Sequence, residues 1–498
     1  MKKIKYIVLS LLAVSFVACE NDTLEDLRDR VDNSEEPLPE LTSGDADFSN
    51  YVSIGASFTA GFTDNGLFIA SQENSFPNII ASQFANAGGG TFTQPLMNDN
   101  FGGLALAGNR ITDPRLVFGG AGPVPLEAVI GPVTVSTDIA TNNPTGPFNN
   151  LGIPGAKSFH LINNGYGNIQ NLPAAANPYA VRVTGNAPNA SILELAAAQN
   201  PTFFTISEVG GNDVLGYATT GGDGSNPITD TATFTASLNA IVNTMTANGA
   251  KGAIANLPNI TSLSFFTTVP HDPVPLDAAT AGAVNQAYAA YNGGLQLALA
   301  NQLITQEEVE ARTINFEASS ANAVVIEDES LTNLGALGLP SIRQATAEDL
   351  IVLPASTFIG TLADPNNPLS VNGVAIPLAD NWVLIPSEQE EIATATEAYN
   401  AAISAAASAN GLALVDLNSV LVEASTTGVV FDDYTLNTDL VFGGLVSLDG
   451  IHLTARGYAY MANSFLRALD ETYGTNFEAS GNLAKAGDYP TNYSPLLQ

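Results

Sequence analysis

The sequence predicts an α/β fold built around a parallel sheet. Near-continuous apolar runs recur along the chain, and segments with helical character lie between them; the runs are YVSI (51–54), TFFTISEV (202–209), GAIANL (252–257) and LALVDL (412–417). Runs that are apolar on successive positions suit strands whose two faces are both covered. Strands that alternate with helices indicate βαβ units with right-handed crossovers.

Four segments carry the composition and spacing of helices, and they span 191–199, 231–249, 277–302 and 387–411. In the last of these, Ser387 is followed three residues later by Glu390, the pattern of a capping box, and Gly411 marks its end. Two other stretches break the alternation, 62–148 and 262–384. We therefore expect one α/β domain over 49–498 that carries these two stretches as insertions, and insertions on loops commonly contact ligands.

Composition excludes one class of partner. The chain has 498 residues and a formal net charge of −34, with charged residues making up only 13%. Sites for a phosphate backbone are built from clusters of Lys and Arg, so we expect no nucleic-acid partner.

The N-terminal segment has the layout of a secretory signal peptide, predicted over residues 1–18. Three lysines precede an apolar run that is too short for a comfortable membrane span, and the run ends in FVAC at Cys19. FVAC resembles a bacterial lipobox, which predicts lipid modification of Cys19 and membrane attachment at the outer-membrane surface. An ordinary signal peptide with a chance cysteine is the alternative. Residues 19–48 are acidic and poor in apolar residues, which predicts a flexible tether.

Ser57 follows the first apolar run and lies between small residues, which is typical of a nucleophile held at the end of a strand. Hydrolysis through a serine needs a base, a group that orients the base, and donors for the oxyanion. Asp449 precedes His452 by three residues, ahead of an amphipathic helix for which Thr454 is a plausible N-cap. A loop at a helix entrance can turn both side chains the same way, so the carboxylate can bond one imidazole nitrogen.

The other two histidines suit different roles. His160 lies within an apolar stretch and is expected to be packed, and His271 lies in a proline-rich loop and is expected to be solvated. Two segments are candidates to supply hydrogen-bond donors for the oxyanion. Gly155 lies in the glycine-bearing turn NNLGIPGAKS and offers a backbone N–H, while Asn212 follows a glycine pair that allows close approach to a ligand.

Taken together, these segments resemble the SGNH (GDSL-type) hydrolase superfamily. Its Gly-Asp-Ser-Leu block is present as Gly55-Ala56-Ser57-Phe58, and its Asn-x-x-x-x-Gly-like turn runs from Asn150 to Gly155. Its Gly-x-Asn-Asp block matches Gly210 to Asp213, and Asp-x-x-His is complete at Asp449 to His452. One departure is that Ala56 stands where Asp is usual, an Asp that does not carry out the bond-breaking chemistry in the family.

The resemblance implies a three-layer α/β/α, flavodoxin-like core and a serine esterase or lipase. It implies Ser57 as nucleophile, His452 as general base and then acid, and Asp449 as the residue that orients His452. The oxyanion hole would comprise the Ser57 N–H, the Gly155 N–H and the Asn212 side chain. No cofactor is implied. The nucleophile elbow of the α/β-hydrolases is disfavoured, because it needs Gly-x-Ser-x-Gly and Thr59 stands two residues after Ser57.

Substrate and metal remain open from the residues alone. A lipid-like or general carboxylic ester is favoured over an acetylated carbohydrate, since long apolar insertions can roof an acyl pocket. A non-catalytic surface protein that binds glycan or lipid on the same scaffold is a third interpretation. The loops GGDGSNPITD (221–230) and ADPNNP (363–368) have oxygen ligands that suit calcium, but such acidic loops usually face water, so no metal is expected.

Overall fold

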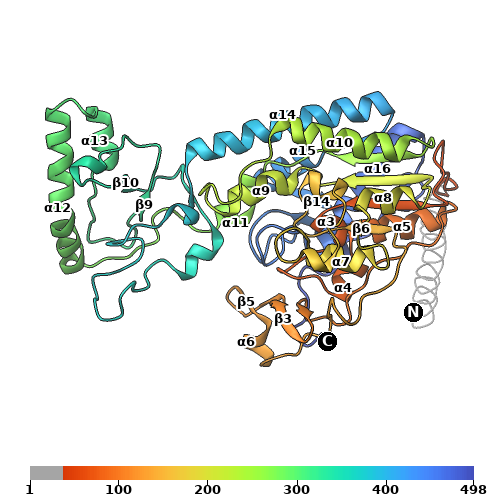
Figure 1. Cartoon of the computed structure of the whole chain (residues 1–498), viewed down its shortest axis with the longest axis horizontal. Coiled ribbons are helices and arrows are strands. Elements are labelled where there is room, and N and C mark those ends of the chain that lie inside the picture. The colour runs from red at the N-terminus through yellow and green to blue at the C-terminus, as the bar shows by residue number, and fades with distance from the viewer. Residues whose placement is uncertain (1–36, 498) are drawn as a thin grey trace, which may run out of the picture.

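The computed structural model describes residues 37–497, and its centre is a parallel sheet of five strands (Figure 1). The strand order is β13-β8-β7-β1-β6, with every neighbouring pair parallel. Counted along the chain this is the order 2-1-3-4-5 of flavodoxin-like folds, which confirms the expected class. The strands are β1 (Tyr51–Gly55), β6 (Asn150–Gly152), β7 (Phe203–Ser207), β8 (Lys251–Ala255) and β13 (Ala413–Val415).

Four of the strands coincide with the apolar runs in the sequence, and the fifth, β6, does not. All five residues of β1 and of β7 are buried, as expected for strands covered on both faces. β6 has only three residues, Asn150, Leu151 and Gly152, and its one large apolar side chain is too weak a signal for a strand. It pairs with β1 in register through Ser53 and Asn150.

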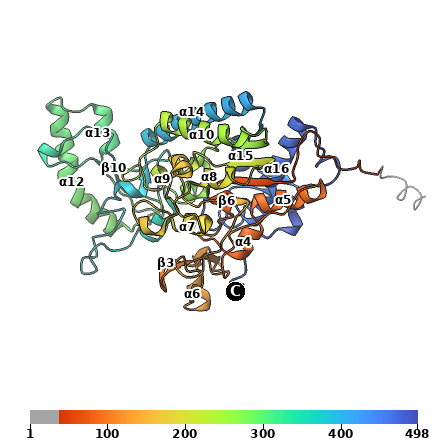
Figure 2. The same cartoon turned by 45° about the vertical axis from the view of Figure 1, so that its right-hand side comes forward.

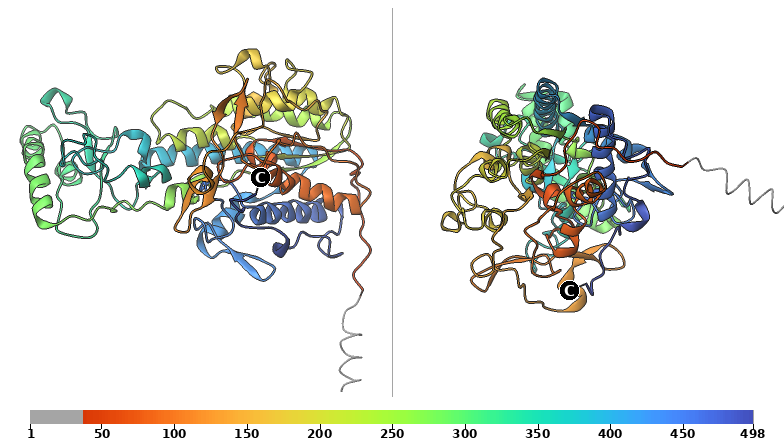
Figure 3. Two further views of the ribbon diagram at one scale, coloured as in Figure 1. Left: turned by 90° about the horizontal axis from the view of Figure 1, so that it is seen from below. Right: turned by 90° about the vertical axis from the view of Figure 1, so that its right-hand side faces the viewer.

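Helices cover both faces of the sheet. α5 (Phe76–Asn86) and α16 (Ala455–Tyr473) lie side by side on one face (orange and blue in Figure 3), where the rings of Phe76 and Phe465 stack at 5.0 Å. The other face is covered by α8 (Ile192–Ala197), α10 (Thr231–Thr246) and α14 (Pro386–Asn410).

The start of α14 differs from the capping box expected at Ser387. The helix begins one residue earlier, at Pro386, whose missing N–H is tolerated at the first helical position. Glu388 is therefore the third helical residue, and its Oε2 accepts a hydrogen bond of 2.8 Å from the Ile385 N–H. The capping carboxylate is thus Glu388 rather than Glu390.

Residues 262–384 form most of a lobe that projects from one end of the sheet (green and teal in Figures 1 and 2). The ring of Tyr288 is buried in this lobe, and its hydroxyl donates to the Val374 carbonyl at 2.8 Å. The lobe elements are α11 (Ser264–Thr267), α12 (Ala278–Ala300), α13 (Gln306–Arg312), β9 (Val325–Glu327), β10 (Ile342–Gln344), β11 (Leu350–Ile351) and β12 (Val383–Leu384).

The stretch 62–148 contains α5 of the core and several short elements below the sheet in Figure 1. These are α4 (Ile69–Glu73), β2 (Leu104–Leu106), β3 (Asn109–Thr112), β4 (Leu116–Phe118), β5 (Pro123–Pro125) and α6 (Leu126–Ile130). The remaining elements are α3 (Ser57–Ala60), α7 (Pro178–Thr184), α9 (Gly211–Thr219), α15 (Leu417–Thr426), β14 (Val429–Phe431) and β15 (Tyr434–Leu436).

The expected signal peptide, Cys19 and most of the expected tether lie outside the described residues. The last residues of that tether range do pack on the core: Phe48 is buried, and its ring stacks on Phe84 at 3.8 Å. The folded body therefore begins before residue 49, since Ala46 is also buried and the Asp45 N–H donates to the Tyr473 carbonyl at 2.8 Å. Over 37–497 no helix combines the length and apolar character that crossing a membrane requires.

Candidate active site

Ser57 lies at the carboxyl end of β1, where it opens the short helix α3. β1 and β7 are the neighbours at which the strand order reverses, and ligands of open α/β sheets bind at such a switch point. Gly55 is required here, since a Cβ at this position would lie 2.5 Å from the carbonyl oxygen of Ser207 on β7. The glycine thus lets the two strand ends approach closely and places Ser57 beside the segment that follows β7.

Glu208 is the residue of that segment that contacts Ser57, and it belongs to none of the motifs in the sequence. Its carboxylate accepts hydrogen bonds from the backbone N–H groups of Ala56 (3.1 Å), Phe58 (2.7 Å) and Thr59 (3.0 Å). The Ser57 hydroxyl donates to Oε1 of the same carboxylate at 3.2 Å. Glu208 thereby satisfies the amides that open α3 and fixes the loop that carries Ala56 and Ser57.

Two properties set Glu208 apart. Its φ is +55°, a left-handed conformation that is uncommon for a residue other than glycine. Burial raises the pKa of its carboxyl group, while the hydrogen bonds from Phe58 and Thr59 act in the opposite direction. A partly buried acidic residue with a left-handed backbone, directly after a core strand, is typical of functional sites.

Asp449 and His452 form the pair that the sequence predicts. His452 Nδ1 lies 2.9 Å from Asp449 Oδ2. The other oxygen, Oδ1, accepts from the N–H groups of Ile451 (2.9 Å) and His452 (2.8 Å). Burial acts to raise the pKa of Asp449, but the adjacent imidazole and these donors outweigh it and hold the pKa well below its usual range. The carboxylate stays charged and fixes the ring, so the second imidazole nitrogen faces away from it.

Two aromatic rings of the Ser57 segment contact His452. Its ring centroid lies 5.8 Å from that of Phe58 and 4.7 Å from that of Phe62. The fold therefore brings the 449–452 loop against α3, although the two segments are almost four hundred residues apart.

A second acidic residue, Asp64, supports the Asp449 loop. Its carboxylate accepts from the Leu448 N–H at 3.1 Å, and its own N–H donates to the Ser447 hydroxyl at 3.1 Å. That hydroxyl in turn donates to Asp449 Oδ1 at 3.0 Å. Burial raises the pKa of Asp64 to about 7. Asp64 lies in the first of the two irregular stretches, where no local pattern distinguishes it.

Gly155 and Asn212 lie on segments that are bonded to each other. The Asn212 amide donates to the Ala156 carbonyl at 3.0 Å, and the neighbouring Asp213 carboxylate accepts from the N–H and the hydroxyl of Ser158, both at 2.7 Å. Gly155 is exposed and has a φ of +78°, which glycine adopts without strain. Within 37–497, neither the Gly155 N–H nor the Ser57 N–H has a protein acceptor.

An apolar pocket opens beside Ser57. Ser57, Glu208 and Asn212 are among the polar residues that line it. Its walls come from α9, α15, α16 and the segment after β8, and they include Val214, Leu215, Leu257, Ile260, Leu263, Leu421, Leu445, Ile451, Leu453 and Met461. His452 and Asp449 line a neighbouring hollow, and Ile451 belongs to both. The arrangement suits a ligand with a polar centre at Ser57 and an apolar chain in the pocket.

The predicted N-cap of α16 and the predicted packing of His160 are confirmed. Thr454 caps α16 by accepting from the Gly457 N–H at 2.9 Å. His160 is packed, with its ring stacked on Tyr166 at 4.5 Å, and burial lowers its pKa to about 4. Neither feature takes part in the site.

Comparison with known proteins gives one result. No protein-family model and no curated protein sequence matches the chain. The solved structure of the extracellular lipase from Streptomyces rimosus is similar to it over 85% of this chain and 99% of that chain, with 10% identity and a TM-score of 0.29. At so low a TM-score the fold rests on the strand order given above.

Proposed function

We propose that this protein is a serine esterase that hydrolyses carboxylic esters with an apolar acyl chain. The observation that carries the proposal is the placement of Ser57 at the mouth of the apolar pocket, with an imidazole oriented by Asp449 on the neighbouring loop. The three roles that such a reaction requires are then filled by groups on adjacent segments.

The reaction follows from these groups. The Ser57 oxygen attacks the ester carbon, and its proton moves to the free nitrogen of His452. The Ser57 N–H, the Gly155 N–H and the Asn212 amide stabilise the oxyanion. His452 then returns the proton to the leaving alcohol, and an acyl-enzyme forms. Water, activated by the same imidazole, hydrolyses this intermediate and restores the Ser57 hydroxyl.

Glu208 is a positioning residue in this scheme. In the structure its carboxylate accepts a hydrogen bond from the Ser57 hydroxyl. This hydrogen bond must break when the proton moves to His452. Three backbone amides already donate to its carboxylate and hold it in place, whereas the second nitrogen of His452 is free to act as the base. Its contribution is to hold α3 so that the Ser57 N–H stays available.

The pocket lining supports a lipid-like acyl group over an acetylated sugar. A sugar presents many hydroxyl groups, which would lie unpaired against leucine, isoleucine and valine side chains. An alkyl chain gains about 0.8 kcal/mol for each buried methylene.

Turnover of p-nitrophenyl esters from acetate to palmitate, measured for the wild type and Ser57→Ala, tests the proposal. We expect hydrolysis by the wild type that improves as the chain lengthens, and none above background for the variant. Faster release of acetate from acetylated sugars would favour the carbohydrate esterase. Equal background rates for both proteins, with lipid or glycan binding retained, would favour the non-catalytic binder.

The proposal places the enzyme at the cell envelope, anchored through a lipid on Cys19. The lipobox-like FVAC and the acidic residues that follow it support this placement. Mass spectrometry of the mature N-terminus tests it: a diacylglyceryl cysteine is expected, and an unmodified chain in the soluble fraction would contradict it.

A further inference from the structure

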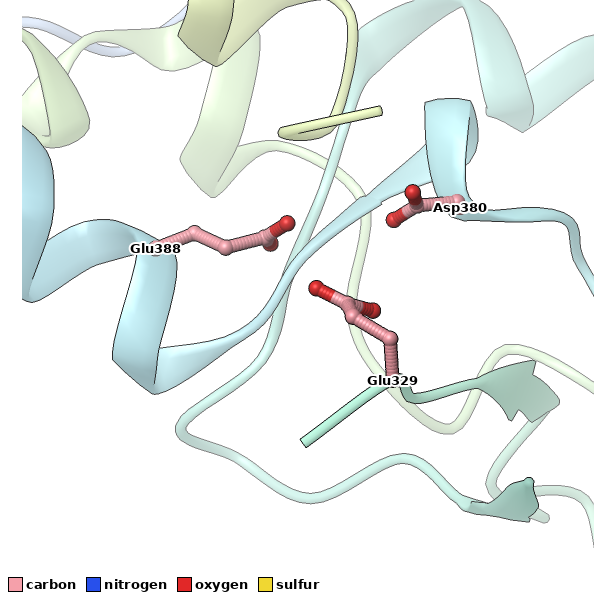
Figure 4. A group of neighbouring side chains, drawn as sticks. All are labelled: Glu329, Asp380 and Glu388. Carbon is pink, nitrogen blue, oxygen red and sulfur yellow. The ribbon is translucent and has the colours of Figure 1, made fainter. Parts of the chain in front are cut away.

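Three carboxylates gather where the projecting lobe joins the core, far from Ser57 in the sequence. One ligand oxygen from each of Glu329, Asp380 and Glu388 lies within 4.8 Å of the others. Figure 4 shows the three side chains pointing toward one another from separate segments. Glu329 follows β9 of the lobe, Asp380 opens a short turn before β12, and Glu388 lies in the first turn of α14.

Glu388 carries the unusual feature of this cluster. The residue is 3% exposed, and its Oε2 caps α14 through the Ile385 N–H. Its Oε1 is buried and has no hydrogen-bond partner, although it points toward the other two carboxylates. A buried, unpaired carboxylate oxygen is costly unless something else compensates it.

The backbone closes around the same oxygen. A Cβ on Gly222 would lie 1.8 Å from Glu388 Oε1, and a Cβ on Gly221 would lie 2.1 Å from the Asp380 carbonyl oxygen. The two glycines therefore allow the loop after α9 to approach both acidic residues. This loop is the start of GGDGSNPITD, which has oxygen ligands that suit calcium.

Nearby acidic residues of the lobe are compensated differently. Arg343 pairs with Asp328 at 2.5 Å and with Asp349 at 2.6 Å. Across the described residues, no Lys, Arg or His forms an ion pair with the cluster of Glu329, Asp380 and Glu388. Arg343 thus balances the charges of Asp328 and Asp349. No basic side chain of the described residues does the same for the three-carboxylate cluster.

We propose that Glu329, Asp380 and Glu388 bind a calcium ion that fastens the lobe to the core. The donors are all oxygens on three separate segments, which suits the large and flexible coordination shell of Ca²⁺ better than the strict octahedron of Mg²⁺. The ion would replace the missing partner of Glu388 Oε1. The first turn of α14 and the lobe strand β9 would then be held together through it. The proposal is independent of the esterase proposal, since none of these residues lines the pocket beside Ser57.

Burial, followed by the charges of Glu329 and Asp380, raises the pKa of Glu388. This agrees with a group of negative charges that lacks its counter-charge. The alternative is a proton shared between Glu388 and its neighbours in place of a metal, and the experiment distinguishes the two.

The only tryptophan of the chain provides a local reporter. Trp382 lies two residues after Asp380, and its ring stacks on Phe358 at 4.8 Å. Tb³⁺ bound at the cluster should therefore luminesce when tryptophan is excited, and Ca²⁺ should displace it. In parallel, thermal unfolding of the full-length protein is followed with chelator, with Ca²⁺ and with Mg²⁺.

We expect sensitised Tb³⁺ luminescence, its loss on adding Ca²⁺, and a higher Tm with Ca²⁺ than with chelator or Mg²⁺. Glu329→Gln should weaken Ca²⁺ binding by at least about tenfold, and because Glu329 is exposed this change should leave folding intact. Glu397→Gln is the matched control, an exposed glutamate of α14, and should bind Ca²⁺ like the wild type.

Trp382→Phe should lose the luminescence but keep the Ca²⁺-dependent rise in Tm. The proposal is overturned if Ca²⁺ leaves the Tm of the wild type unchanged and no sensitised luminescence appears, as a shared proton predicts. It is also overturned if Glu329→Gln and Glu397→Gln weaken binding equally, or if Mg²⁺ alone stabilises the protein.

Discussion

Two groups of acidic residues in this molecule contrast in how their charges are balanced. At the sheet edge, Glu208 and Asp449 each accept hydrogen bonds from backbone amides, and Asp449 also faces an imidazole. At the lobe junction, Glu388 and its two neighbours face one another, and one oxygen of Glu388 has no partner. Donors around a carboxylate stabilise its negative charge, whereas carboxylates that face each other need a cation or a proton.

The largest effect is expected from removing the proposed nucleophile at the sheet edge. Ser57→Ala should lower kcat by a factor on the order of 10⁴ or more, because no acyl-enzyme can form. Steady-state hydrolysis of p-nitrophenyl esters measures the loss. Ser356→Ala, which changes an exposed serine near the same surface, is the control and should retain activity. Comparable activity of the two variants would show that the sheet edge has a different role.

Removing an oxyanion donor is expected to have the next largest effect. Asn212→Ala should lower kcat by about 100 to 1,000-fold with little change in KM, because the amide acts on charge that develops only in the transition state. A variant that mainly raises KM would indicate that Asn212 binds the substrate in its ground state instead.

Blocking the pocket sharpens the assignment of substrate. Leu421 lies on α15 and is buried against the pocket, while its neighbour Val422 is 48% exposed. Leu421→Trp should lower kcat/KM for palmitate esters by about tenfold, which corresponds to losing the burial of one or two methylenes, and should spare acetate esters. Val422→Trp is the control on the same helix. An equal loss for short and long chains in Leu421→Trp would contradict an acyl site there.

The smallest effect concerns stability at the lobe junction. Burial raises the pKa of Glu388, and the charges of Glu329 and Asp380 raise it further. The pKa of Glu388 is higher in the folded than in the unfolded chain, so its contribution to stability is complete below the unfolded value of about 4.5. That contribution is lost as the pH rises toward the folded pKa.

In chelator the Tm should therefore fall as the pH rises from about 5 to about 8, and Glu388→Gln should reduce this fall by about 1 to 3 °C. Differential scanning calorimetry at several pH values measures both. A pH dependence that is identical in the wild type and Glu388→Gln would show that Glu388 is not the titrating group.

The parts of the fold that follow from local pattern could be predicted from the sequence. The long buried runs specified β1 and β7, and the apolar face of α16 together with Thr454 specified that helix. β6 cannot be predicted in this way, because three residues with one large apolar side chain give no periodicity. The hydroxyl of Ser387 with Glu390 three residues later predicts a helix start one residue too late, because Pro386 occupies the first helical position.

The residues of the candidate site also fall into two groups: some stand in short sequence motifs, and others are defined only by contacts with distant segments. Ser57, Asn212 and the Asp449–His452 pair stand in short motifs, so their local sequence is enough to single them out as candidates. Glu208 and Asp64 could not be identified this way, because each acts through contacts with segments far away in the chain. Glu208 does leave one local signal, an acidic residue between a buried strand and a glycine pair. The acidic cluster at the lobe junction leaves none, since its three members belong to different elements.

Covalent labelling with a fluorophosphonate ester tests the central claim most directly, because it reports the nucleophile itself. Intact-mass spectrometry followed by peptide mapping should find one adduct, on Ser57, that is absent in Ser57→Ala and forms more slowly in His452→Asn. An adduct on another residue, or none on a folded protein, would contradict the account.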